Sequence, residues 1–177
     1  MHSAIGDVAS EFQYGFIPER QISDNILLST VLIRGYTRAH VSLGCLLKVD
    51  LKKAYDSINR SLIKDIMVEL GFPDCFIKWV FTCITTVSYN ILINGRPTKP
   101  FSAKKGLRQG DLMSPFMFAI GIEYLTRNLQ QLQAQPDFNF HLKCEKLAIT
   151  HLMFADDLLM FSRDDIQSIQ MMSASFT

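Results

Sequence analysis

Cysteine is scarce in this sequence, and the cysteines present are not arranged as close pairs or as metal ligands. Cys45, Cys75, Cys83 and Cys144 lie far apart, with no C-x-x-C pair and no histidine at zinc-finger spacing. This spacing argues against a structural zinc site, which draws on close pairs of cysteine or histidine. Isolated cysteines are typical of buried thiols in an intracellular protein, so we expect that class rather than a secreted disulfide-stabilised domain.

Long hydrophobic runs are also missing. Residues 1–12 include Asp7 and Glu11 and contain no apolar core of a secretion signal. The longest apolar stretch, residues 112–125, is shorter than a bilayer-spanning helix and is interrupted by proline and glutamate. We therefore expect an intracellular protein without a membrane partner, while the sequence does not distinguish nucleus from cytoplasm.

Acidic residues are absent from one long stretch, Cys75 to Gly110. Six of the 18 basic residues lie there and all 17 acidic residues lie elsewhere, so the formal net charge of +1 conceals a basic segment. The six are Lys78, Arg96, Lys99, Lys104, Lys105 and Arg108. A local positive field attracts phosphates whatever the total charge, although a solvated protein face has the same composition.

What is present otherwise is the composition of one globular domain, since 48% of the 177 residues are hydrophobic and 20% are charged. Hydrophobic periodicity and turn residues predict alternating helices and short strands. The predicted helices cover residues 23–33 (or 24–33), 60–70, 74–85 and 114–132, and the predicted strands cover 44–51, 88–93, a partner ending near 101, 147–154 and 158–161.

Several positions within these elements carry specific expectations. Helical spacing places Ile26, Leu27, Val31 and Ile33 on one broad apolar face of the first helix. Asn94-Gly95 predicts a type I′ hairpin turn. Trp79 lies where we expect the core of its helix.

Two adjacent acids, Asp156 and Asp157, form the predicted turn between two apolar strands. Aspartate is common in turns for structural reasons, but like charges this close need a compensating cation or donor. The strand at 44–51 carries a further acid, Asp50, and a short antiparallel sheet can bring it beside that turn. Grouped carboxylates are the hard ligands that Mg²⁺ prefers, and paired metal ions suit in-line displacement at phosphorus.

Four segments, which follow one another along the chain in the family's order, resemble the reverse transcriptases of non-LTR (LINE-type) retrotransposons, with plant elements the most similar. KVDLKKAYDSINR (48–60), GLRQGDLMSPFMFAI (106–120) and FADDLLMF (154–161) resemble the three palm motifs, and GFIPERQISDNILL (15–28) resembles the block that precedes them. Leu112-Met113 stand where the family usually has Pro-Leu, which predicts a looser turn. The order of the four blocks makes coincidence very improbable.

The resemblance assigns roles to matching residues. Asp50 and Asp156 match the metal-binding carboxylates, Asp157 is the third catalytic acid and is expected to bind metal as well, and the Leu51 carbonyl matches a backbone metal ligand. Tyr55 matches the steric gate beneath the incoming sugar, although a packed core tyrosine is the alternative. Gln109 and Gly110 match the nucleotide-binding Gln-Gly, and Arg108 is expected to hold the nucleotide or an acid. The role of Asp56 stays open between helix capping and catalysis. Lys99, Lys104 and Lys105 are expected to contact template or primer phosphates.

The implied fold is α+β: a right-hand polymerase palm with a small antiparallel sheet backed by helices, truncated fingers and no thumb. We expect one partial reverse transcriptase domain over residues 1–177, with a fingers-proximal helical segment at 1–42 and the palm at 43–177. The implied function is RNA-directed DNA synthesis with two Mg²⁺ ions, for which Mn²⁺ can substitute, and with RNA template, DNA primer and dNTP as partners.

Two alternatives to an active polymerase remain. One is a non-catalytic remnant or excerpt that folds and at most binds nucleic acid weakly. The other, a nucleotide cyclase, is disfavoured because its Gly-Gly-acid-acid-Phe turn is absent. The sequence does not decide whether the chain is part of a longer polyprotein, which template it prefers or its oligomeric state. Because the finger strands and the thumb have no counterpart here, we expect the fragment alone to be inactive.

Overall fold

The computed structural model describes residue 6 and residues 9–17, 19–34 and 44–176. The chain divides into two compact parts. We call Met1–Lys52 together with Ile122–Thr177 the sheet unit, and Lys53–Gly121 the hairpin unit. The predicted boundary at residues 42–43 lies outside the described residues, so it stays a prediction.

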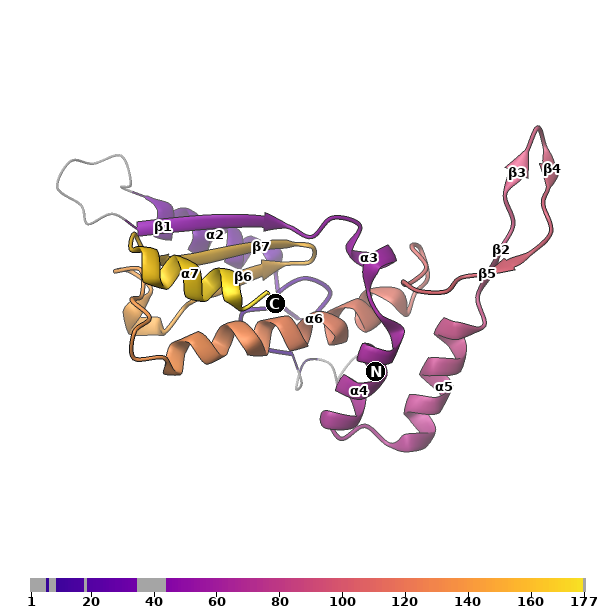
Figure 1. Ribbon diagram of the computed structural model, residues 1–177, viewed down its shortest axis with the longest axis horizontal. Helices are drawn as coiled ribbons and strands as arrows, with labels where there is room; N and C mark the ends of the chain where they lie inside the picture. Colours follow the sequence, from indigo (N-terminus) through magenta and orange to yellow (C-terminus); the bar gives the residue numbers. More distant parts are fainter. Residues whose placement is uncertain (1–5, 7–8, 18, 35–43, 177) are drawn as a thin grey trace. The chain divides into compact units, whose positions relative to one another are not determined.

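A three-stranded antiparallel sheet is the centre of the sheet unit (Figure 1). It consists of β1 (Gly44–Asp50), β6 (His151–Phe154) and β7 (Asp157–Arg163), in the order β1-β7-β6. Strand β7 lies in the middle, where Leu158, Met160 and Phe161 are fully buried. The predicted strands at 44–51 and 158–161 are confirmed. The strand predicted at 147–154 begins only at His151, because residues 145–147 form a 3₁₀ turn.

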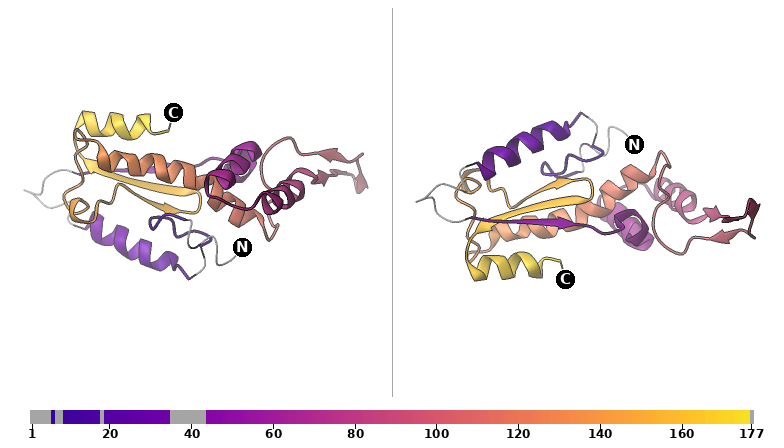
Figure 2. Two further views of the ribbon diagram at one scale, coloured as in Figure 1. Left: turned by 90° about the horizontal axis from the view of Figure 1, so that it is seen from below. Right: turned by 90° about the horizontal axis from the view of Figure 1, so that it is seen from above.

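Helices α2 (Ile22–Ile33) and α7 (Ile166–Ala174) lie on opposite sides of this sheet (Figure 2). Helix α6 (Ser114–Gln130) contributes its second half to the sheet unit and continues as a 3₁₀ turn, Gln131–Ala134. Asp165 caps α7, because its carboxylate accepts a hydrogen bond from the Ser168 N–H at 2.8 Å. That bond holds the pKa of Asp165 below its ordinary value.

The packed side of α2 differs from the predicted one. Its buried residues are Asn25, Ser29 and Leu32, one stripe at helical spacing. Of the side chains expected to form the apolar face, Ile26, Leu27 and Val31 are more than half exposed, and Ile33 is half-buried. Counting apolar residues fails here because the polar Asn25 faces the sheet, where its amide contacts the Met153 carbonyl at 3.5 Å.

One core cluster of the sheet unit joins α2, the sheet and the segment before α2. Its buried members are Phe12, Leu32, Cys144, Ile149, Leu152 and Phe161. Burial raises the pKa of the Cys144 thiol to about 12, so this cysteine is a protonated core residue. The expectation of buried thiols is wrong for Cys75 and Cys83, which are exposed.

A helical pair forms the base of the hairpin unit. Helices α4 (Arg60–Glu69) and α5 (Asp74–Thr85) follow the short α3 (Ala54–Ser57), close to the predicted bounds. Buried Ile63, Ile66 and Met67 of α4 and buried Ile77, Val80 and Ile84 of α5 give the pair its apolar interior. Trp79 is not part of it: its side chain is 67% exposed, which corrects the sequence expectation.

The predicted hairpin forms in two short pieces. Strands β2 (Ser88–Tyr89) and β5 (Phe101–Ser102) pair at its base, and β3 (Leu92–Ile93) and β4 (Arg96–Pro97) pair at its tip. Asn94 and Gly95 both have positive φ, 49° and 78°, as a type I′ turn requires. The ladder is interrupted between β4 and β5, in a gap that contains Pro100, which lacks the N–H that a strand partner needs.

No helix in the described part of the chain is long and apolar enough to cross a membrane.

Candidate active site

The end of the sheet brings two of the predicted catalytic acids opposite each other. Asp50 is the last residue of β1 and pairs in register with Asp157, the first residue of β7. Residues directly opposite in an antiparallel pair have Cβ atoms roughly 4.5–5.5 Å apart and share one face. Asp156 lies in the adjoining turn, and its carbonyl accepts a hydrogen bond from the Leu51 N–H at 3.1 Å. The sheet therefore holds the backbones of all three acids at one end.

The charges of these acids are unequally compensated. Asp50 and Asp156 are exposed, whereas Asp157 is half-buried and forms an ion pair with Lys48, with 3.0 Å between Nζ and Oδ1. The donor chemistry fits a hard divalent cation, because carboxylate oxygens are the ligands that Mg²⁺ prefers. Within the described residues, however, no three acidic, histidine or cysteine side chains are gathered as a complete ligand group. The fit to a metal ion therefore lies in the placement of the acids rather than in an assembled coordination shell.

The turn that carries Asp156 is supported by the segment before α2. Phe12 and Tyr14 exchange backbone hydrogen bonds with Met153 of β6, so this segment lies beside β6 up to the turn. Gly15 then reaches Ala155 of the turn so closely that a Cβ atom on it would be 2.4 Å from the Ala155 nitrogen. Only glycine permits this approach. The segment 15–28, which begins with Gly15, thus fixes the turn that carries Asp156.

The hairpin unit assembles the predicted nucleotide-binding residues around one loop. The Tyr55 carbonyl accepts a hydrogen bond from the Leu107 N–H at 2.8 Å, and the Ile58 carbonyl accepts one from the Gly106 N–H at 3.1 Å. Gly106 has a φ of 79° and lies against the backbone of Asp56, where a Cβ atom would clash. The loop is thereby fastened two residues before Gln109.

Arg60 is a structural residue of this loop that the sequence analysis did not identify. It is 7% exposed, and its guanidinium donates hydrogen bonds to the carbonyls of Gly106 at 2.7 Å and Ala103 at 2.8 Å. A third, longer bond of 3.5 Å reaches the Lys105 carbonyl. The side chain thus ties the start of α4 to the loop. A single arginine at the start of an amphipathic helix gives no sequence signal for such a role.

The side chains after this fastening point are available to solvent. Arg108, Gln109 and Gly110 are all exposed. The turn that follows was expected to be loose for lack of proline, yet the Asp111 carboxylate accepts a hydrogen bond from the Met113 N–H at 2.9 Å. That bond closes the turn and leaves Leu112 89% exposed.

Tyr55 is half-buried, and its ring stacks on Phe118 with 4.6 Å between centroids and 10° between planes. Packing is the alternative to a steric gate that the sequence leaves open for Tyr55. The contact with Phe118 is such packing, and it involves one face of the ring. Asp56 does not cap α4, since that role belongs to Asn59, whose side chain accepts a hydrogen bond from the Ser61 N–H at 3.0 Å.

The three predicted phosphate-contacting lysines, Lys99, Lys104 and Lys105, are exposed along the second half of the hairpin and the loop after it. The acids and Leu51 belong to the sheet unit, whereas Tyr55, the Gln109 loop and these lysines belong to the hairpin unit. Each unit thus carries its own set of predicted site residues.

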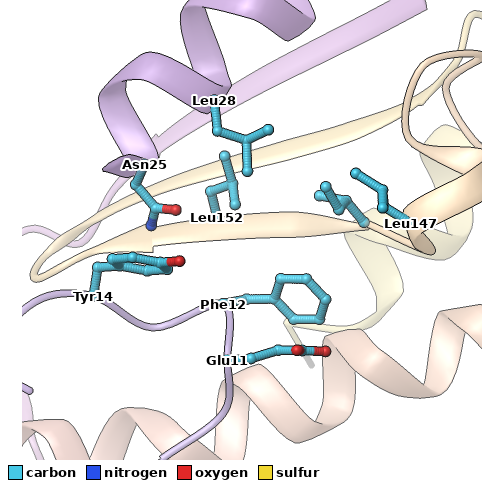
Figure 3. Close-up of a pocket in the computed structure, with 8 residues that line it drawn as sticks. Glu11, Phe12, Tyr14, Asn25, Leu28, Leu147 and Leu152 are labelled. Atoms are coloured by element: carbon cyan, nitrogen blue, oxygen red, sulfur yellow. The ribbon is translucent and has the colours of Figure 1, made fainter. Parts of the chain in front are cut away.

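A pocket of about 220 Å³ lies elsewhere in the sheet unit, lined mainly by apolar side chains (Figure 3). Phe12, Leu28 and Leu152 face it, together with the buried Asn25. It contains none of the predicted site residues.

Comparison with known proteins identifies the family of this chain. The model of the family "Reverse transcriptase (RNA-dependent DNA polymerase)" matches residues 1–176. The chain belongs to this family.

Its relatives include Pol polyproteins of retrotransposable elements. The chain is 32% identical over 134 residues to the Pol polyprotein of a type-1 R2 element of Popillia japonica, covering 76% of this chain and 20% of that protein. It is 27% identical over 151 residues to the type-2 R2DM Pol polyprotein of Drosophila melanogaster, covering 85% and 13%. The chain thus spans a fifth or less of these relatives. A retrotransposon reverse transcriptase domain is confirmed, while a plant origin stays a prediction.

Among solved structures, the fold is similar to that of telomerase from Candida albicans in complex with a fragment of telomeric RNA, with a TM-score of 0.68 and 13% identity over 98% of this chain and 31% of that one. At this identity the likeness concerns the fold alone. The predicted α+β class with a small antiparallel sheet is confirmed, and the likeness is consistent with a polymerase palm.

Proposed function

We propose that this domain is the palm of an RNA-directed DNA polymerase, in which Asp50 and Asp156 bind the catalytic divalent ions. The observation that carries the proposal is the register of β1 with β7, which sets Asp50 against the Asp156-Asp157 turn at one end of the sheet. In the reaction, the primer 3′-oxygen attacks the α-phosphorus of a dNTP and loses its proton. The bond from that phosphorus to the bridging oxygen breaks, and pyrophosphate leaves.

Bound Mg²⁺ or Mn²⁺ would supply activation of the attacking oxygen and stabilisation of the leaving charge. The residues of this chain do the rest. Asp50, Asp156 and the Leu51 carbonyl would hold the ions, with Asp157 as the third acid. Gln109, Gly110 and Arg108 would contact the incoming nucleotide from the fastened loop.

Tyr55 would lie beneath the sugar of that nucleotide and exclude a 2′-hydroxyl. Its stacking on Phe118 supports this role, because a ring supported on one face cannot move away from a clash on the other. Replacement Tyr55→Ala should raise the ratio of ribonucleotide to deoxyribonucleotide incorporated by a longer protein that contains this domain. An unchanged ratio would leave Tyr55 with packing alone.

The template–primer duplex would be held by Lys99, Lys104 and Lys105. Basic side chains that contact phosphates supply affinity without sequence preference. The exposed positions of these lysines on a segment without acidic residues support this assignment.

Metal binding separates this proposal from a non-catalytic remnant. Titration of the 177-residue chain with Mn²⁺ should show a site that Asp50→Asn weakens at least tenfold, because one of two charged ligands becomes neutral. Asp65→Asn, at an exposed acid of α4, is the matched control. Equal affinity in the wild type and in Asp50→Asn would favour the remnant.

Polymerisation by the chain alone is expected to be negligible even so. Positioning of reactants supplies roughly 7–11 kcal/mol of a barrier, and we expect the exposed loop and lysines alone to hold the triphosphate and the primer too loosely to supply it. Extension of oligo-dT on poly-rA measures this. Robust extension that disappears in Asp156→Asn would show that these residues suffice.

A further inference from the structure

Among the described ion pairs, one joins Lys48 to an acid of this site, and the sequence analysis gave Lys48 no role. It shares a face of β1 with Asp50, two residues away, and its register partner on β7 is Leu159. From there its side chain reaches diagonally to Asp157, with 3.0 Å between Nζ and Oδ1. No ion pair of Asp50 or Asp156 occurs among the described residues.

This ion pair is poorly explained by fold stability. Its side chains are 60% and 41% exposed, and exposed pairs contribute little to folding because water and salt screen them. What the pair does change is the balance among the acids. Two carboxylates directly opposite on a sheet repel each other, and Lys48 neutralises one member of that pair.

We propose that Lys48 is a positioning residue that holds Asp157 away from the metal ions and leaves Asp50 and Asp156 as their ligands. The inference rests on the proposed function and deepens it, because it explains which of two adjacent acids binds metal. Asp157 then contributes charge at the edge of the site rather than a ligand. Lys48 also lowers the negative potential of the site and so limits its affinity for divalent ions.

The charge of Lys48 can be removed without leaving a buried charge unpaired. In Lys48→Met, Asp157 loses its cation and can turn toward the ions, and the site becomes more negative. Affinity of the 177-residue chain for Mn²⁺, measured by calorimetric titration, should tighten roughly threefold to tenfold. Lys48→Arg keeps the ion pair and should retain the wild-type affinity. Lys146→Met, at an exposed lysine of the same unit, should also leave it unchanged.

A double-mutant cycle tests whether Asp157 becomes a ligand. In the wild-type background, Asp157→Asn should change the Mn²⁺ affinity less than about threefold. In the Lys48→Met background the same replacement should weaken it about tenfold. Circular dichroism of each variant would verify that the fold is retained.

The outcomes separate this inference from the function on which it rests. Mn²⁺ binding that depends on Asp50 but is unaffected by Lys48→Met would overturn the role of Lys48 and leave the metal site standing. Equal tightening by Lys146→Met would overturn it too, since the effect would then be one of net charge. Binding that is insensitive to Asp50→Asn would overturn the metal site and the inference with it.

Discussion

The sheet of strands β1, β6 and β7 has the acids at one end and a fully buried centre, whereas the hairpin of strands β2 to β5 and the loop after it carry basic residues and expose large apolar side chains. Leu158 and Met160 of β7 are 0% exposed, while Leu92 at the hairpin tip is 70% exposed. Each hairpin strand is only two residues long.

The difference fits what each region would do under the proposed function. Metal ligands must be held in place within a fraction of an ångström, which requires paired strands and a packed core. Contacts to a phosphate backbone need positive charge at the surface, and loosely supported side chains supply it. Substitutions in the sheet should therefore affect stability and chemistry together, whereas substitutions in the hairpin should affect binding alone.

The largest expected effect on stability is at Arg60, a buried residue of the hairpin unit that supports the loop before Gln109. Arg60→Ala removes the guanidinium that ties the loop before Gln109 to α4, leaving carbonyls that lose their donor. The free energy of unfolding should fall by roughly 3 to 4 kcal/mol, since hydrogen bonds to a charged group are among the stronger ones. Urea denaturation measures this. Arg96→Ala, at an exposed position of β4, should cost less than about 0.5 kcal/mol, and equal losses would contradict the distinction.

A buried histidine tests the packing of the sheet through pH. His151 of β6 is 0% exposed, and burial lowers its pKa to about 4. Its unfolded pKa is near 6.5, so below that value the unfolded chain takes up a proton that the folded imidazole does not. Stability is therefore complete above about pH 6.5 and is lost as the pH falls toward 4, by about 3 kcal/mol in total.

The comparison variant is His151→Gln, which has no proton to gain in this range. Unfolding free energies measured between pH 7 and pH 4 should fall more steeply for the wild type than for the variant. Parallel curves would show that the imidazole is not held neutral by the core.

The smallest effect on stability belongs to the hairpin lysines. Lys104→Glu combined with Lys105→Glu should change the free energy of unfolding by less than about 0.5 kcal/mol, because both side chains are exposed. Affinity for an RNA–DNA hybrid should fall about tenfold at low salt and depend less steeply on salt, since fewer counterions are released. Fluorescence anisotropy measures both, with Lys146→Glu as the control. Unchanged affinity and salt slope would remove this surface from the proposal.

Local sequence patterns predicted the elements that carry the acids. Alternation marked the strand at 44–51, which ends at Asp50 in the structure, and two acids between apolar runs marked the turn at Asp156. Helix α5 was predicted with its observed bounds, Asp74–Thr85. These features depend on neighbouring residues, which is why the sequence alone indicates them.

Features that depend on distant contacts were missed. Helix α2 presents Asn25 to the sheet rather than Ile26, and Trp79 lies at the surface, because tertiary packing overrides hydrophobicity counts. The Arg60 and Lys48 contacts join residues of different elements, and nothing in the local pattern reveals the partner. The hairpin was predicted as one ladder, yet its strands pair in two short pieces.

The central claim is that Asp50 and Asp156 serve one metal site, and a double-mutant cycle in Mn²⁺ affinity tests it most directly. Asp50→Asn and Asp156→Asn should each weaken binding at least tenfold. The double variant should be little weaker than either single one, because a shared site is already lost after the first replacement. Asp137→Asn, at an exposed acid outside the site, should bind as the wild type does. Losses that simply add, or wild-type affinity in Asp156→Asn, would show that the two acids do not form one site and would contradict the account.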